Sequence, residues 1–435
     1  MSYAQKIEEL ITCSMDEILR RYEADTNYSL INTKLDLLTG KDFSAQDPWY
    51  KQKDIIFCWI QGRGIEALAR HIRYFAQKND TGRVERLTKF LVAVTDSMEF
   101  VRLRNHNRLF FMMNLRGDKL TLDANGNPQK NTELCPTANY SDLFYTKGLL
   151  ASACLQKSKK LLPRARKWLD VTIADIKNET FKTDQQMFDP ANPVTYIYGK
   201  QLQGPKMIAL SATALGMEVD TDNRDHWERS GKALLKILFE KYLALEDKGE
   251  LKQYDFWEAV DKDGVPWEDN GKIICDPGHG LEFVGLSLKN LLSFKTPSGI
   301  KLANKCRKFY ADLLVHLFEI GFAPGPQGII KSFDLRSRKP VNTDMPWWSL
   351  PETIRAAALC YEFTGDERCC DIMKKCLDAF FNCYVRYDLH HMAVQTRNSR
   401  GEAVAVIPAT PDADPGYHTN LSLIDALPVI RKLNM

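Results

Sequence analysis

The chain has 435 residues, of which 44% are hydrophobic and 26% are charged, and its net charge at pH 7 is +3. These values are ordinary for a globular protein, and with no long Lys/Arg stripe they exclude a nucleic-acid partner. No apolar run approaches the length of a membrane span, so we expect no membrane partner. The first nine residues lack the apolar core of a signal peptide, which predicts a cytoplasmic protein.

The chain contains eleven cysteines. Their number is odd and several fall in predicted helices, so we expect reduced thiols. Cys369, Cys370 and Cys376 lack the spacing of a zinc site, which favours a role in helix packing. His390 and His391 stand together in a long predicted loop without further ligands at workable spacing. We therefore predict no metal site.

Helical periodicity recurs about twelve times along the chain. The predicted helices span residues 5–22, 55–77, 82–99, 139–157, 160–178, 204–217, 223–243, 279–294, 298–320, 349–364, 366–383 and 418–432. The links between them alternate strictly in length. The short links are 78–81, 158–159, 218–222, 295–297 and 365, and the long links are 23–54, 100–138, 179–203, 244–278, 321–348 and 384–417.

Short links join antiparallel helix pairs, so all the long links must lie at one end of the assembly. This predicts an all-α (α/α)6 barrel, or toroid, forming a single domain over residues 1–435. A helical-repeat solenoid is the alternative, although a short sequence period is missing. The long links carry turn signals at 123–128, 261–264 and 398–401, and residues 119–122 alternate in polarity, which predicts short β-hairpins there.

The segment Cys275–Glu282 is the most informative for chemistry. A Pro-Gly turn places His279 in the first turn of an apolar helix, and Glu282 follows on the same face. The positive end of the helix dipole should lower the pKa of His279 and favour a neutral base. A buried histidine that caps its own helix is the alternative interpretation.

Polar and aromatic residues also gather near the starts of the other helices that follow long loops. From these positions we expect substrate contacts from Arg63, Asp142, Glu282, Trp348 and Glu352, with His418 as a second histidine. Each has a structural alternative. Arg63 could form a surface ion pair, Asp142 could favour its helix N-terminus, Trp348 could be core, and His418 could cap its helix. Ser349 and Glu352 also match a capping box.

These residues resemble the N-acylglucosamine 2-epimerase superfamily over nearly the whole chain. Asp276-Pro-Gly-His-Gly-Leu-Glu282, preceded by the loop Val260–Gly264, resembles that family's Pro-Gly-His-x-Leu-Glu segment. Met345–Glu352, followed by Tyr361–Asp366, resembles its Trp-Trp…Glu…Tyr…Thr-Gly-Asp segment. Two weaker motifs of the family are also matched, one by Gln61-Gly-Arg63 and the other by Tyr140-Ser-Asp142 with Gly148-Leu149.

The resemblance implies an (α/α)6 barrel that interconverts sugars at C2 through two histidines, here His279 and His418. Arg63 and Glu352 would hold the small-molecule sugar substrate. It implies that no cofactor is required, and it allows a nucleotide activator and a homodimer. The family's last motif, Phe-His-x-Pro-Arg, reads Tyr417-His-Thr-Asn-Leu421 here, so an arginine is missing.

The missing arginine suggests a neutral sugar, or a substituent read instead by Lys206 or by loop residues such as Arg397. We therefore expect a neutral or N-acylated hexose rather than a sulfonated one. Some branches of the family place a third histidine near 204–208, and none stands there, which favours the N-acylglucosamine type. We therefore predict a sugar 2-epimerase that works through an enediolate. An aldose–ketose isomerase, a glycoside hydrolase using Glu282, Glu352 or Asp142, and a carbohydrate-binding protein with a degenerate site are the alternatives.

Overall fold

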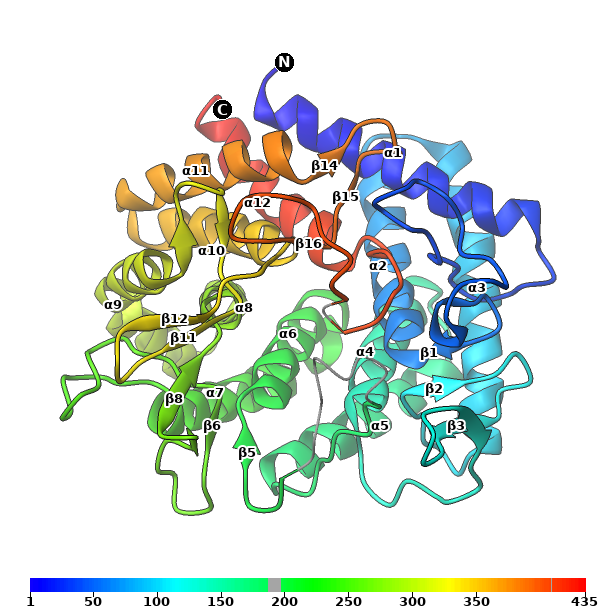
Figure 1. Cartoon of the computed structure of the whole chain (residues 1–435), viewed down its shortest axis with the longest axis horizontal. Helices are drawn as coiled ribbons and strands as arrows, with labels where there is room; N and C mark the ends of the chain where they lie inside the picture. Colours follow the sequence, from blue (N-terminus) through cyan, green and yellow to red (C-terminus); the bar gives the residue numbers. More distant parts are fainter. Residues whose placement is uncertain (187–196, 408) are drawn as a thin grey trace. The chain divides into compact units, whose positions relative to one another are not determined.

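A computed structural model describes residues 1–186, 197–407 and 409–435 (Figure 1). Its described part contains twelve α-helices, as predicted. They are α1 (Tyr3–Ala24), α2 (Cys58–Gln77), α3 (Thr81–Arg104), α4 (Tyr140–Leu155), α5 (Leu161–Lys177), α6 (Gly204–Val219), α7 (Arg224–Lys241), α8 (Pro277–Ser293), α9 (Pro297–Gly321), α10 (Ser349–Thr364), α11 (Arg368–Cys383) and α12 (Ser422–Lys432). Parts of two predicted links, residues 187–196 and 408, lie outside the described residues.

Local sequence signals explain several helix starts. The side chains of Asp80, Asn139, Asp276 and Thr296 accept hydrogen bonds from backbone N–H groups in the first turns of α3, α4, α8 and α9. Such N-caps satisfy donors that have no partner inside the helix. Proline occupies the first turn of α6, α8 and α9, where its missing N–H costs nothing. The helix α10 has the predicted bounds, whereas α3 runs five residues beyond its predicted end.

The short links produce the predicted helix pairs. The helices α2 and α3, α4 and α5, α6 and α7, α8 and α9, and α10 and α11 pack against each other. The chain ends complete the set, because Arg431 of α12 pairs with Glu8 of α1 and the Ala4 N–H donates to the Met435 carbonyl. The short links thus join five packed helix pairs, and α1 and α12 meet where the chain ends.

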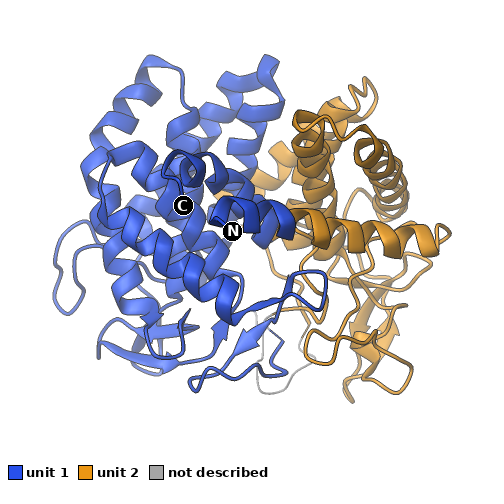
Figure 2. Ribbon diagram, turned by 90° about the horizontal axis from the view of Figure 1, so that it is seen from above, with its two compact units in different colours: residues 1–10, 197–408, 418–435 blue, residues 11–196, 409–417 orange. Residues whose placement is uncertain are grey.

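Two compact units divide the chain (Figure 2). The larger unit contains residues 1–10, 197–408 and 418–435, and the smaller unit contains residues 11–196 and 409–417. The chain therefore passes from the smaller to the larger unit at the Tyr417–His418 bond. The sequence-based expectation of a single domain over residues 1–435 stays a prediction.

Close packing of α2 and α4 organises the smaller unit. A Cβ atom at Gly62 would lie 2.6 Å from backbone atoms of Phe144 and Tyr145, so only glycine permits this approach. The strands β1 (Ile56–Phe57), β2 (Met112–Met113), β3 (Lys119–Leu122) and β4 (Pro128–Lys130) form an antiparallel sheet in that order. The β3–β4 pair confirms the hairpin predicted around residues 123–128.

In the larger unit, α8 packs between α6 and α10, and α12 packs against α10. The four-stranded sheet has the order β12 (Lys339–Asn342), β11 (Ser332–Asp334), β8 (Lys272–Cys275), β7 (Glu268–Asp269). The remaining strands are β5 (Gln201–Leu202), β6 (Ala259–Val260), β9 (Phe322–Ala323), β10 (Gly328–Ile329), β13 (Met345–Pro346), β14 (Val385–Arg386), β15 (Met392–Ala393) and β16 (Thr396–Arg397). Strand β8 leads directly into α8, and strand β13 leads directly into α10. The four-stranded sheet that contains β8 and the β13–β16 pair therefore fix how these two helices begin.

Each of the eleven cysteines is described and each is a free thiol, in agreement with the expected reduced state. Cys369 and Cys376 are buried in α11, as expected for helix packing. Among the described helices, none combines the length and the apolar character that crossing a membrane requires.

Candidate active site

His279 lies in the first turn of α8, where the Pro-Gly turn was predicted to place it. The Asp276 carboxylate accepts hydrogen bonds from the backbone N–H groups of Gly278 and His279, at 2.9 and 3.3 Å. A Cβ atom at Gly278 would lie 2.9 Å from the Trp348 ring, so glycine here admits the indole beside the helix start. The imidazole Nδ1 lies 2.8 Å from Glu258 Oε2, and 31% of the side chain is exposed.

Charged groups around His279 overturn the predicted low pKa. Burial lowers the pKa of His279, but the carboxylates of Asp276 and Glu258 outweigh it and raise the pKa to about 9. The Asp276 oxygen nearest the ring lies 3.5 Å from Nδ1. The helix-dipole argument failed because the capping carboxylate stands at the same helix end. At neutral pH His279 is therefore an imidazolium ion, which is a proton donor.

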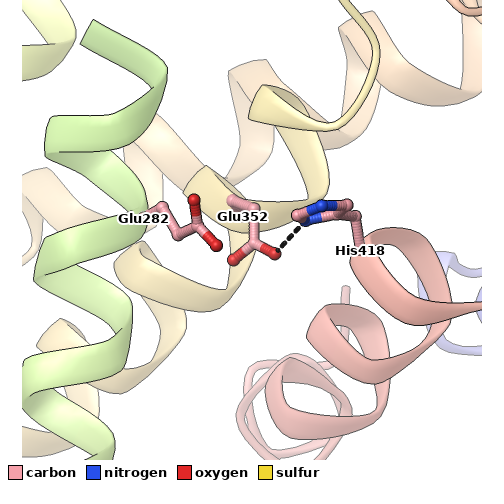
Figure 3. Close-up of side chains that lie close together, drawn as sticks. All are labelled: Glu282, Glu352 and His418. Carbon is pink, nitrogen blue, oxygen red and sulfur yellow. Dashed lines mark hydrogen bonds and ion pairs between the residues drawn. The ribbon is translucent and has the colours of Figure 1, made fainter. Parts of the chain in front are cut away.

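His418 occupies a short π-helix, Tyr417–Leu421, immediately before α12. Its Nδ1 lies 2.9 Å from Glu352 Oε1, and Glu352 is only 1% exposed (Figure 3). The second carboxylate oxygen of Glu352 pairs with Arg355 one turn later on α10. Burial opposes ionisation, yet Arg355 and His418 hold the pKa of Glu352 below its usual value. An ionised carboxylate only accepts hydrogen bonds, so Nδ1 of His418 is the donor.

The capping-box interpretation of Ser349 and Glu352 is wrong. The residue before α10 is Trp348, and no side chain caps this helix. Ser349 Oγ instead donates to the Pro346 carbonyl at 2.7 Å, and Glu352 is engaged by His418 and Arg355. The spacing of a capping box was present, but Ser349 bonds to a nearby backbone carbonyl, and the distant His418 occupies Glu352.

Glu282 lies one turn after His279 on α8 and is buried, with 6% of its surface exposed. Its carboxyl group points toward Glu352 (Figure 3). Burial, and then the negative charge of Glu352, raise the pKa of Glu282. Glu282 therefore keeps its proton to a higher pH than an ordinary glutamate and can donate a hydrogen bond.

Glu282, Glu352 and His418 offer ligand atoms that lie within 4.8 Å of one another, so this cluster has the residue types to hold a metal ion. However, Arg355 brings a positive charge directly onto Glu352, and His418 donates its Nδ1 proton to the same carboxylate. Both contacts oppose a cation at this point. The arrangement is better suited to holding and moving protons.

Trp348 connects the two histidines. Its indole stacks on the His279 ring with centroids 5.2 Å apart, and it lies 5.6 Å from the His418 ring. The neighbouring indole of Trp347 donates to Thr419 at 3.2 Å, which attaches the π-helix to the start of α10. Although Trp348 is buried, its contact with both imidazoles places it with the catalytic candidates as well as in the core.

Arg63 and Tyr417 belong to the smaller unit. The guanidinium of Arg63 lies over the Phe144 ring at 4.2 Å and over the Tyr417 ring at 5.5 Å. Tyr417 accepts a hydrogen bond from buried Lys147 at 2.8 Å, and Lys147 pairs with Glu66 at 2.9 Å. Stacking on aromatic rings suits the planar guanidinium.

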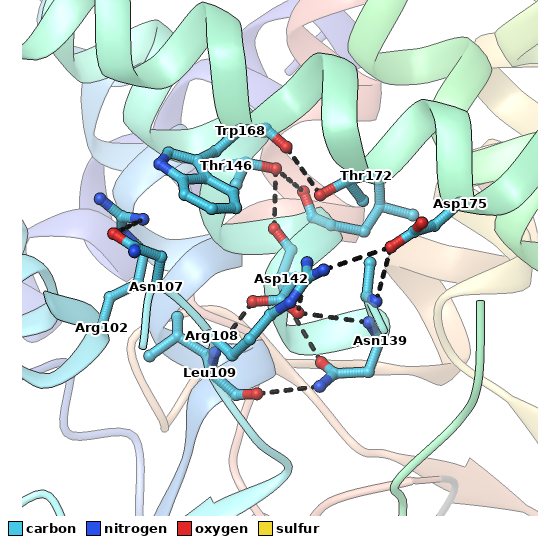
Figure 4. A network of polar contacts seen from close by, with 12 residues as sticks. Arg102, Asn107, Arg108, Leu109, Asn139, Asp142, Thr146, Trp168, Thr172 and Asp175 are labelled. Carbon is cyan, nitrogen blue, oxygen red and sulfur yellow. Dashed lines mark hydrogen bonds and ion pairs between the residues drawn. The ribbon is translucent and has the colours of Figure 1, made fainter. Parts of the chain in front are cut away.

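Asp142 has a structural role in the smaller unit (Figure 4). It forms a reciprocal capping box with Asn139 at the start of α4, and it accepts a hydrogen bond from the Leu109 N–H at 2.9 Å. Burial, only partly offset by the Leu109 bond and by Arg108, raises its pKa to about 7. These contacts favour the alternative interpretation of Asp142 as an N-terminal helix partner over a substrate contact.

The two cations suggested as readers of a sugar substituent are engaged elsewhere. Lys206 is buried at the start of α6 and donates to the Leu202 carbonyl at 3.1 Å. Arg397 donates to the Gly401 and Pro326 carbonyls at 2.9 and 2.8 Å, within its own loop region. Neither contact is directed at the histidines.

Sequence reasoning missed four charged residues at this site: Glu258, Asp276, Lys331 and Arg355. Two of them had a local signal. Asp276 precedes Pro-Gly at a helix start, which is an N-cap pattern, and Arg355 follows Glu352 at i+3 spacing. Glu258 and Lys331 lie outside the helices, in segments whose sequence does not indicate what they contact.

A sequence profile of the N-acylglucosamine 2-epimerase family matches residues 127–413, about two thirds of the chain. The chain belongs to this family. The matched range includes His279, Glu282, Trp348 and Glu352 and ends before His418. As a member of this family the protein is an enzyme, a sugar epimerase or isomerase. Among curated proteins, none matches this sequence.

Solved structures of sugar enzymes share the fold. Cellobiose 2-epimerase from Spirochaeta thermophila DSM 6192 is 14% identical, with a TM-score of 0.67 over 99% of this chain and 98% of that one. A sugar epimerase from a ruminal bacterium is 12% identical, with a TM-score of 0.69 over 98% of both chains. A D-mannose isomerase is 15% identical, with a TM-score of 0.64 over 95% and 97%. The fold class is therefore all-α, of the (α/α)6 type, as predicted.

Proposed function

We propose that this family member is a sugar 2-epimerase that interconverts N-acylglucosamine-type and N-acylmannosamine-type sugars by proton transfer at C2. The observation that carries the proposal is a pair of imidazoles packed against one indole, each with its Nδ1 against a glutamate. A carboxylate at Nδ1 fixes the ring orientation and assigns proton transfer to Nε2.

The proposed reaction uses the two histidines in opposite roles. The C2 proton of an open-chain aldose is acidic because the adjacent carbonyl can hold the charge as an enediolate. His418 removes this proton from one face, and protonated His279 supplies a proton to the other face. Positioned acid–base groups of this kind contribute on the order of 10²–10⁴-fold each. The sugar carbonyl accepts the electrons, so the mechanism requires no cofactor.

The remaining residues bind the sugar in this proposal. Glu282, whose pKa is raised by burial and by Glu352, binds a sugar oxygen, and Trp348 supports the ring. Arg63 binds vicinal oxygens through its two parallel N–H groups. Asn420, two residues after His418, is neutral and offers only amide hydrogen bonds. We therefore propose a neutral or N-acylated hexose as substrate rather than a sulfonated one.

An aldose–ketose isomerase is the second candidate, favoured by the structural match to a D-mannose isomerase. It would use the same enediolate but return the proton to C1. The glycoside hydrolase alternative finds less support. Glu282 and Glu352 face each other, and Glu352 is held by His418 and Arg355, which does not suit two carboxylates flanking a glycosidic bond (Figure 3).

Substitution of each histidine tests the proposal. His279→Asn and His418→Asn should each abolish turnover of N-acetylglucosamine, N-acetylmannosamine, glucose and mannose while circular dichroism stays unchanged. Loss of one base should also affect the exchange step unequally in the two directions. His391→Asn is a matched control, since its positive φ of 60° is one that asparagine tolerates. Wild-type turnover in either of the first two variants would remove that histidine from the mechanism.

A further inference from the structure

We propose that Lys331 is a further catalytic residue, whose ammonium group binds the oxygen that becomes negative when the C2 proton leaves. The inference rests on the proposed function and adds a residue to it. Neither the sequence pattern nor the two-histidine mechanism assigned a role to this lysine. Its placement, its accessibility and the charges around it carry the argument.

Lys331 lies between β10 and β11, and its backbone N–H is fixed by the Asp344 carbonyl at 2.7 Å. Its Nζ lies 2.6 Å from Asp276 Oδ2 and 5.7 Å from the centroid of the Trp348 ring. That indole is the one that both histidine rings contact. The ammonium group therefore stands beside His279 and over the same aromatic surface.

The ammonium group remains reachable. The Lys331 side chain is 37% exposed, close to the 31% of His279, whereas its partner Asp276 is only 5% exposed. The ammonium group of Lys331 thus contacts a buried carboxylate on one side, and its exposed side can bind a ligand. An ammonium group has three donors, and a single carboxylate oxygen uses one of them.

The chemistry needs a cation at this place. Formation of an enediolate adds a negative charge to a site that already holds Asp276, Glu258 and Glu352. His418 takes the C2 proton in this step, and His279 directs its own proton at C2 in the next one, so the oxygen needs a donor of its own. Burial lowers the pKa of Lys331, but Asp276 and Glu258 outweigh it and raise the pKa, so the ammonium group stays charged. A fixed charge aimed at the developing oxyanion lowers the barrier.

Other described cations of the larger unit that were considered for the sugar have different partners. Arg355 is buried against Glu352, and Lys206 and Arg397 donate to backbone carbonyls away from the histidines. Lys331 thus supplies, from a loop, a positive charge near the histidines that the altered Tyr417–Leu421 motif lacks.

The competing explanation is that Lys331 only neutralises Asp276. A double variant separates the two. Asparagine caps helices as well as aspartate does, so Asp276→Asn keeps the start of α8 while it removes the charge that Lys331 would balance. If neutralisation is the whole role, Lys331→Met combined with Asp276→Asn should recover the kcat of Asp276→Asn alone.

The experiment measures kcat, KM and solvent-deuterium incorporation with N-acetylmannosamine and mannose as probes. We expect Lys331→Met to lower kcat about 10²-fold with little change in KM, in the range found for loss of one oxyanion donor. Lys331→Arg should restore part of this loss, and the double variant should remain slow. Lys331 lowers the pKa of His279, so in Lys331→Met the loss of activity at high pH should occur at a higher pH than in the wild type.

Lys289→Met is the matched control, because Lys289 of the same unit is also partly exposed and its Nζ lies 2.7 Å from the buried Asp425 carboxylate, and this variant should keep the wild-type kcat. Recovery of activity in the double variant, or an unchanged kcat in Lys331→Met, would overturn the role of Lys331. Equal losses in Lys289→Met and Lys331→Met would overturn it as well. Failure of the wild type to incorporate deuterium would instead contradict the proposed function itself, so the two failures are distinguishable.

Discussion

Glu258→Gln offers a quantitative test of how His279 is kept protonated. The substitution keeps the size of the side chain and an oxygen acceptor, but it removes the carboxylate 2.8 Å from Nδ1. An opposite charge within about 4–6 Å typically shifts a pKa by 1–3. Glu258 keeps 24% of its side chain exposed, so water screens part of its charge. We therefore expect the pKa of His279 to fall by about 1, the lower end of that range.

The assay is the pH dependence of kcat/KM in the direction in which His279 donates its proton. Activity should be lost above the pKa of His279, giving a basic limb near pH 9 in the wild type and near pH 8 in Glu258→Gln. Glu250→Gln, an exposed glutamate of the same region, should leave the limb in place. If the pH at which kcat/KM falls is the same in Glu258→Gln as in the wild type, or changes only in Glu352→Gln, His279 is not the group that controls this loss of activity.

The same network gives a stability prediction with a definite sign. The pKa of His279 is raised in the folded protein, so the folded state binds this proton more tightly than the unfolded chain. The resulting stabilisation should be complete below about pH 6.5 and should disappear as the pH rises through about 9. The free energies of unfolding of the wild type and Glu258→Gln, measured with urea, should therefore differ at pH 6 and be similar at pH 10.

Three further substitutions test the proposed binding residues. Arg63→Lys should lower kcat/KM at least about ten-fold although the charge is kept, because the paired N–H groups and the stacking on Phe144 are lost; unchanged kinetics would make Arg63 structural. Asp142→Asn should leave KM unchanged and cost about 1 kcal/mol in the free energy of unfolding, and a large rise in KM would restore it as a substrate contact. Trp348→Phe should raise KM less than Trp348→Leu, and equal effects would exclude an aromatic platform.

Much of the fold was predictable because it follows from local patterns. The alternation of long and short links predicted the helix pairs, and the turn at 123–128 predicted the β3–β4 hairpin. The position of His279 also followed from local sequence, since Pro277 and Gly278 favour a helix start there. The π-helix at Tyr417–Leu421 was not predictable, because no residue type in that segment distinguishes it from the α-helix that follows.

The electrostatics of the site depended on residues that are distant in sequence. The pKa of His279 was predicted in the wrong direction because Asp276 brings a carboxylate to the same helix end, and Glu258, 21 residues away, adds a second one from a separate segment. Glu352 satisfied the spacing of a capping box, yet His418, 66 residues later, takes its carboxylate. Helix-dipole and capping rules describe one helix at a time, so they cannot anticipate partners that tertiary packing brings to its end.

The position of solvent deuterium on the sugar tests the central claim most directly. The wild-type enzyme is incubated in heavy water with N-acetylglucosamine, N-acetylmannosamine, glucose and mannose in turn, and each sugar is examined by NMR. The account predicts deuterium at C2 together with appearance of the C2 epimer. Deuterium at C1 with formation of a ketose would establish the aldose–ketose isomerase instead, and a sugar converted without any deuterium on carbon would contradict proton transfer by His279 and His418.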